Sequence, residues 1–144
     1  MRFPGTEIGL GLLVAATAAM TIPVSRWTTT LAPVSEASGA VVGTAELDSA
    51  GSGASIAKIS IRGDQPGAIR PWHVHHGQCG QDGAVLGSPK DYPPITVGPD
   101  GTGSATAALD VASPASGDYL VNVHASAGDL GTIVACGDLH TSGK

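Results

Sequence analysis

The chain has 144 residues and a formal net charge of -5, with 21 glycines, 10 prolines and only 3% aromatic residues. This length suits one small domain behind a leader, and an aliphatic core with many turns is typical of an all-β fold. From Val41 onward there are ten acidic and five basic residues, which argues against nucleic acid as a partner because phosphate binding needs basic patches.

Residues 1–27 are predicted to be an N-terminal membrane anchor or signal segment. Residues 8–24 carry no charge, and as a helix they would span about 25 Å, near the lower limit for a membrane crossing. Ala16-Thr17-Ala18 is an acceptable cleavage site, so a signal peptide is the alternative. We expect one retained transmembrane helix. The residues expected to pack that helix or anchor it at the membrane interface are Gly9, Gly11, Ala15 and Trp27.

Residues 28–40, which read TTTLAPVSEASGA, are small and polar and predict a linker to a β-domain over 41–144. In that domain, apolar alternation between Gly, Pro and Asp turns predicts strands. The expected strands cover residues 41–47, 54–62, 68–75, 95–97, 104–111, 118–124 and 132–139. The segment 77–94 is expected to form a loop.

Three histidines are the candidate metal ligands. His73 and His75 point to the same side of a strand, because side chains alternate with a period of two. A second strand that carries His124 can bring a third imidazole to them. Three neutral imidazoles suit copper or zinc. His76 points to the opposite face of a regular strand and is a weaker, fourth candidate.

The order of these motifs resembles the Cu/Zn superoxide dismutase family. That family has a His-x-His copper pair, then a cysteine, a late histidine on a Val-x-Val-His-like strand and a C-terminal Ala-Cys-Gly. The matching pieces here are His73-Val74-His75, Cys79, Val121-Asn122-Val123-His124 and Ala135-Cys136-Gly137. The resemblance spans about residues 41–139. It implies an antiparallel Greek-key β-barrel or sandwich and a Cys79–Cys136 disulfide.

The departures from that family imply that its chemistry is reduced. The bridging and zinc-binding histidines of the family have no counterpart, because residues 77–123 contain no histidine. The family's active-site arginine, three residues before the final cysteine, corresponds to Ile133. The resemblance therefore implies copper as the only expected metal, with zinc not expected. It identifies no catalytic residue and implies that dismutase activity is lost or much reduced.

A second family, the CHRD-type domain, is also similar. Its motif order is matched by His73-Val74-His75-His76-Gly77, by Gly80-Gln81-Asp82-Gly83 and by the segment from Tyr119 to His124. Both resemblances imply the same kind of β-sandwich or barrel, and neither of them secures an enzyme activity.

The sequence predicts a bacterial-type inner-membrane protein with its β-domain in the periplasm, or a secreted or periplasmic domain if the leader is cleaved. Two cysteines behind a hydrophobic leader are typical of an oxidising compartment. The expected role is an accessory or structural subunit that packs against integral membrane subunits of a larger complex, such as a respiratory or photosynthetic one. The alternative is a copper-binding periplasmic protein or a copper-only superoxide dismutase.

Overall fold

The computed structural model describes residues 13–18, 25–36 and 39–142, and this part of the chain is all-β, as predicted. The elements are β1 (Arg26–Pro33), β2 (Val42–Ser49), β3 (Ser55–Arg62), β4 (Ile69–Arg70), β5 (Trp72–Gln78), β6 (Gln81–Val85), the 3-10 turn η2 (Pro89–Asp91), β7 (Ile95–Thr96), β8 (Gly103–Leu109), β9 (Tyr119–Ser126) and β10 (Asp129–Thr141).

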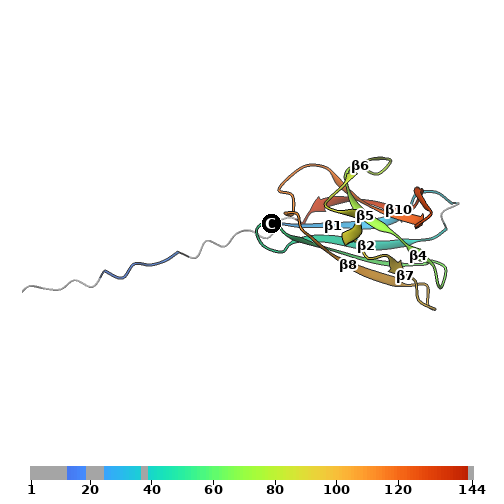
Figure 1. Cartoon of the computed structure of the whole chain (residues 1–144), viewed down its shortest axis with the longest axis horizontal. Helices are drawn as coiled ribbons and strands as arrows, with labels where there is room; N and C mark the ends of the chain where they lie inside the picture. Colours follow the sequence, from blue (N-terminus) through green and yellow to red (C-terminus); the bar gives the residue numbers. More distant parts are fainter. Residues whose placement is uncertain (1–12, 19–24, 37–38, 143–144) are drawn as a thin grey trace, which may run out of the picture.

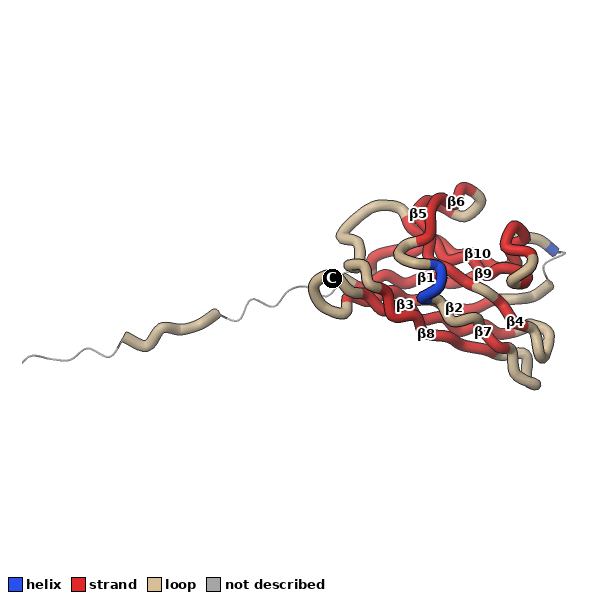
Figure 2. The backbone as a smooth tube through the Cα atoms, viewed as in Figure 1, coloured by secondary structure: helices blue, strands red, loops and turns tan. Residues whose placement is uncertain are grey.

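Eight of the strands form one antiparallel sheet, in the order β6-β5-β9-β10-β1-β2-β3-β8, while β4 pairs with β7. The long sheet curls on itself into an open half-barrel (Figures 1 and 2). The curl encloses an aliphatic core, because alternate residues of each strand point inward. The largest fully buried side chains include Leu31, Leu47, Ile59, Trp72, Val74, Leu109, Val121 and Val123.

The first strand corrects two predictions. Residues 28–40 are not simply a linker, because β1 begins at Arg26 and pairs with both β2 and β10 in the middle of the sheet. Trp27 is not a membrane anchor, since its side chain is 4% exposed and its Nε1 donates to the Pro114 carbonyl at 2.9 Å. Thr28 and Thr30 occupy exposed, outward positions of β1, and the run of threonines obscures in the sequence the alternation that buries Trp27 and Leu31.

The predicted N-terminal helix is not confirmed. Residues 13–18, with Ala15 among them, have no secondary structure and are exposed, while Gly9 and Gly11 lie outside the described residues. Within the described ranges, no helix is long and apolar enough to cross a membrane. The membrane anchor therefore stays a prediction.

The segment predicted as a loop over 77–94 contains β6, which folds back on β5 as a hairpin, and the turn η2. A bulge lies between His75 and Gly77. Gly77 has a φ of 108°, and a Cβ atom at this position would collide with the Gln81 carbonyl oxygen. Only glycine therefore fits the backbone at the bulge from which this hairpin turns.

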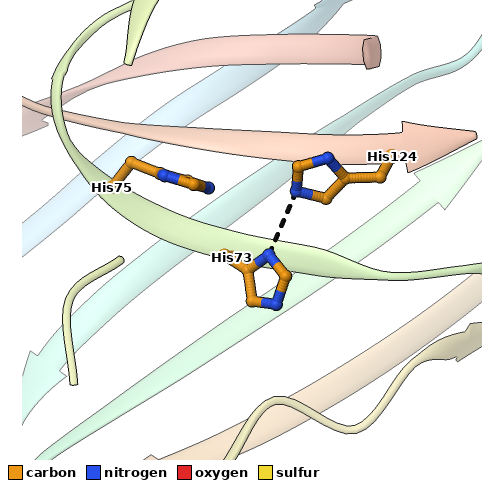
Figure 3. Close-up of side chains that lie close together, drawn as sticks. All are labelled: His73, His75 and His124. Carbon is orange, nitrogen blue, oxygen red and sulfur yellow. Dashed lines mark hydrogen bonds between the residues drawn. The ribbon is translucent and has the colours of Figure 1, made fainter. Parts of the chain in front are cut away.

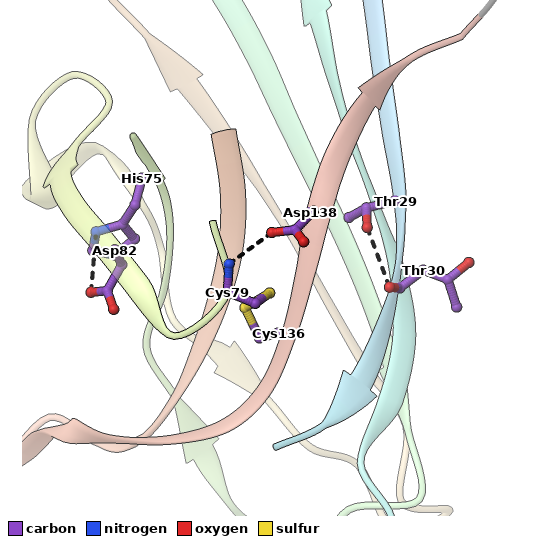
Figure 4. Close-up of a disulfide and its surroundings, with 7 residues drawn as sticks. All are labelled: Thr29, Thr30, His75, Cys79, Asp82, Cys136 and Asp138. Carbon is purple, nitrogen blue, oxygen red and sulfur yellow. Dashed lines mark hydrogen bonds and ion pairs between the residues drawn. A yellow bond between two sulfur atoms is a disulfide. The ribbon is translucent and has the colours of Figure 1, made fainter. Parts of the chain in front are cut away.

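The predicted disulfide is confirmed. Cys79, at the tip of the β5–β6 hairpin, is bonded to Cys136 on β10, 57 positions later in the sequence (Figure 4). The Cys79 backbone N–H also donates to the Asp138 carboxylate at 2.7 Å. These two links join the hairpin at one end of the sheet to β10, which lies beyond β9.

A largely buried ion pair holds the β3–β4 connection against β9. Arg70 donates to both carboxylate oxygens of Asp64, at 2.7 and 2.6 Å, and to the Ala125 carbonyl at 2.7 Å. The Asp64 side chain is only 1% exposed. Hydrogen bonds from Arg70, together with the Gln65 backbone N–H, hold the pKa of Asp64 below its usual value despite burial.

Replacing both cysteines by serine is expected to lower the free energy of unfolding by up to about 4 kcal/mol, because the unfolded chain regains the freedom of a long closed loop. Urea denaturation of the oxidised protein and the Cys79→Ser/Cys136→Ser variant measures the difference. Reductant should lower the midpoint of the parent protein and leave that of the variant unchanged. Equal midpoints for the oxidised parent and the variant would contradict this expectation.

Acid should weaken the fold partly through Asp64. Because its folded pKa is depressed, its stabilising contribution is fully present above the unfolded pKa of about 3.9 and is lost as the pH falls through the folded pKa. Urea denaturation across the acid range should therefore give a shallower decline for Asp64→Asn than for the parent, from a lower stability at neutral pH. Parallel pH curves for the two proteins would rule out this role.

Candidate metal centre

Three histidines converge on one side of the β5–β9 pair (Figure 3). His73 and His75 come from β5 and His124 from β9, and one ring nitrogen of each lies within 4.8 Å of the others. Their exposed fractions are 8%, 7% and 4%. The neighbouring residues Trp72 and Val74 belong to the core, so the histidines occupy the opposite face of β5. The sequence left open whether the three imidazoles meet, and the fold brings them together.

His76 does not join this cluster. Its side chain is exposed, and its ring lies 4.9 Å from the ring of Tyr119, which is its partner across the strands. His76 thus lies on the face expected from the sequence, because strand alternation directs it away from His73 and His75. Among the described residues, the group that can hold a metal comprises three histidines.

Backbone carbonyls orient two of the imidazoles. His75 Nδ1 lies 2.9 Å from the Gly83 oxygen, and His124 Nδ1 lies 2.8 Å from the Leu130 oxygen. A carbonyl oxygen only accepts hydrogen bonds, so each Nδ1 must carry the proton and each Nε2 keeps its lone pair. This arrangement is the usual support for a metal-binding histidine.

The remaining ring nitrogens meet at the centre of the cluster. His73 Nδ1 lies 3.0 Å from His124 Nε2, which has no proton, so His73 donates this hydrogen bond in the metal-free protein. His75 Nε2 is buried and has no hydrogen-bond partner among the described residues. The donor set offered to a metal is therefore His73 Nδ1, His75 Nε2 and His124 Nε2.

Burial favours the uncharged form of two of these imidazoles, those of His73 and His124. It is the main cause that lowers the pKa of His73 to about 4, with smaller contributions from the nearby His124 and His75. Burial also lowers the pKa of His124, although the hydrogen bond to Leu130 acts in the opposite direction. At neutral pH these two imidazoles are uncharged, which is the form that coordinates metals.

The segment 77–94 supplies part of the wall of the site. The Tyr92 ring packs edge-on at 5.2 Å from the rings of both His73 and Trp72, and its hydroxyl donates to the Leu86 carbonyl at 2.7 Å. The Asp82 carboxylate lies 4.0 Å from His75 Nδ1. Sequence reasoning missed Tyr92, and it also missed the Gly83 and Leu130 carbonyls, which have no residue-specific signal.

The arginine that contacts β9 beside the cluster is already held in an ion pair. Ile133 pairs with His124 in the β9–β10 register. It is the residue that the family resemblance aligns with an arginine. Arg70 bonds to Ala125, the residue after His124, but its guanidinium is held by Asp64. The cluster therefore has the donors for a metal, while this arginine is committed to an ion pair.

The three-histidine set fits copper or zinc, since both metals accept neutral imidazole nitrogens. A scan of protein-family models and a search of curated proteins both find no match to this chain. The functional argument therefore depends on the geometry of the site.

The hydrogen bonds predict the tautomers of the three histidines in the metal-free protein. We expect His73, His75 and His124 all to carry their proton on Nδ1, and we expect His73 to move it to Nε2 when a metal replaces the His73–His124 hydrogen bond. Long-range proton–nitrogen NMR correlations distinguish the two tautomers. An Nε2-protonated His75 or His124 would contradict the assigned donor set.

Proposed function

We propose that the domain binds one copper ion through His73, His75 and His124. The observation that carries this proposal is the buried Nε2 of His75, which lies in a cluster of three converging imidazoles and has no partner in the described part of the chain. An unsatisfied buried polar atom costs about 1–3 kcal/mol, so a native site usually provides a partner for it. A bound metal satisfies this atom and both ring nitrogens beside it.

Copper is favoured over zinc by the family resemblance. The ligand order along the chain follows the copper motifs of Cu/Zn superoxide dismutase, while the zinc-binding histidines have no counterpart. The antiparallel, curled sheet supports the barrel-like architecture that the resemblance implies. Neutral nitrogen ligands also suit copper in either of its common oxidation states.

A copper ion held here would supply one-electron chemistry toward small oxygen species, and copper-only superoxide dismutation is the reaction that the resemblance implies. The chain itself provides ligands that its backbone carbonyls hold in place. It provides little electrostatic attraction for an anion, since the net charge is -5 and Ile133 is uncharged. We therefore propose a copper-binding domain with slow turnover at most.

An oxidising, extracytoplasmic location belongs to the same proposal and is supported by the disulfide. The role as an accessory subunit of a membrane complex depends on the residues before Ser25, most of which lie outside the described part of the chain. The converging histidines therefore favour the copper-binding role over the accessory role.

Copper titration of the metal-free protein tests the proposal. The parent protein should bind one copper per chain and give an electron paramagnetic resonance spectrum with nitrogen ligands. His124→Ala removes a ligand and should weaken copper binding by more than about 100-fold, since loss of an outer-shell partner alone costs about 10- to 100-fold.

His76→Ala is the matched control, because it removes an exposed imidazole from the opposite face of the same strand. It should bind copper as the parent protein does. Equal loss of binding in His76→Ala and His124→Ala would contradict the site, and tight binding of zinc without copper would contradict the choice of metal.

A further inference from the structure

Asn122 is a second buried polar group without a partner near the candidate metal centre. The residue is 2% exposed, and its Nδ2 has no hydrogen-bond acceptor within the ranges that the structure describes. Its amide hydrogens cannot be satisfied by bulk water at this burial, so they carry the same cost as the orphaned nitrogen of His75. Two such atoms in one region indicate that something outside the chain completes this site.

The strand register places Asn122 among the metal-binding residues. Asn122 on β9 lies directly opposite His73 on β5, and directly opposite residues of an antiparallel pair share a face with Cβ atoms about 5 Å apart. Asn122 also precedes His124 by two positions, so both side chains project from the same face of β9. Its neighbours Val121 and Val123 belong to the core on the other face.

We propose that Asn122 Nδ2 donates a hydrogen bond to a small monoanion bound to the metal that His73, His75 and His124 hold. The inference rests on the proposed copper site, and it adds a residue that selects and positions the metal's external ligand. Three protein ligands leave a coordination position for such a ligand, as in catalytic metal sites. The ligand class is an anion of two or three heavy atoms, such as a dioxygen-derived species.

The chemistry of the surrounding residues favours an amide donor. The Arg70 guanidinium is engaged by Asp64, and Ile133 offers no donor on its side chain. A donor held inside a water-poor site costs no reorganisation when charge arrives, so a neutral amide stabilises an anion there more than it would in water. Asn122 thus offers one hydrogen-bond donor beside the cluster, where long-range attraction is weak.

Azide is the probe, since it is a small monoanion whose binding to oxidised copper produces a charge-transfer absorption band. The parent protein and the variant Asn122→Leu, whose side chain has the same branching of heavy atoms, are each loaded with one equivalent of copper, and metal analysis verifies the loading. We expect the azide dissociation constant to rise about 10-fold or more in Asn122→Leu, because a hydrogen bond to a charged group is lost. The copper stoichiometry should not change.

Two further variants separate this role from a structural one. Asn122→Asp has nearly the same shape but replaces the donor with a negative charge, so it should weaken azide binding more than Asn122→Leu does. Thr106→Val makes a similar polar-to-apolar change at an exposed position of β8 and should leave azide binding unchanged. Metal-free Asn122→Leu should be at least as stable to urea as the parent, since an orphaned buried donor is removed.

The outcomes distinguish the two proposals. If copper-loaded Asn122→Leu and Asn122→Asp bind azide as tightly as the parent, the role of Asn122 is overturned while the copper site stands. If the parent protein takes up no copper, both proposals fall together. If Asn122→Leu is less stable and its azide affinity is unchanged, Asn122 is a structural residue and the inference is wrong.

Discussion

The pairing of β5 with β9 is the interaction on which the rest of the site depends. Its register directs Trp72 and Val123 into the core and His73 and Asn122 to the opposite face. A slip of one residue in this pairing would exchange the two faces and bury imidazoles in the aliphatic core. The same hydrogen-bonded ladder therefore determines both the packing of the domain and the convergence of its polar residues.

Two hairpins supply the backbone carbonyls that orient the histidines on this ladder. The β5–β6 hairpin brings the Gly83 carbonyl to His75, and the β9–β10 hairpin brings the Leu130 carbonyl to His124. The Cys79–Cys136 disulfide ties the first of these hairpins to β10. Because each carbonyl determines which ring nitrogen keeps its lone pair, backbone conformation determines the donor set for a metal.

Burial removes the polar groups of this site from water and leaves some of them without a hydrogen-bond partner among the described residues. The low pKa of His73 and the orphaned nitrogens of His75 and Asn122 have the same origin, which is the removal of polar groups from water. A copper ion and its external ligand would satisfy these groups together, which is why the two proposals share one physical basis. The Asp64–Arg70 ion pair next to β9 is satisfied within the protein and needs no such completion.

The sequence alone determined the β class and the shared face of His73 and His75, because strand alternation has a period of two. The motif order, through the family resemblance, anticipated the pairing of Cys79 with Cys136. Sequence reasoning failed for β1, where the run of threonines obscures the alternation that buries Trp27 and Leu31, and for β6, which lies in a stretch of turn residues. Only the tertiary structure decided that His124 meets the other two histidines, that His76 turns away, and that Gly83 and Leu130 orient the rings. These features depend on strand register and on backbone carbonyls, which every residue carries and no sequence pattern marks.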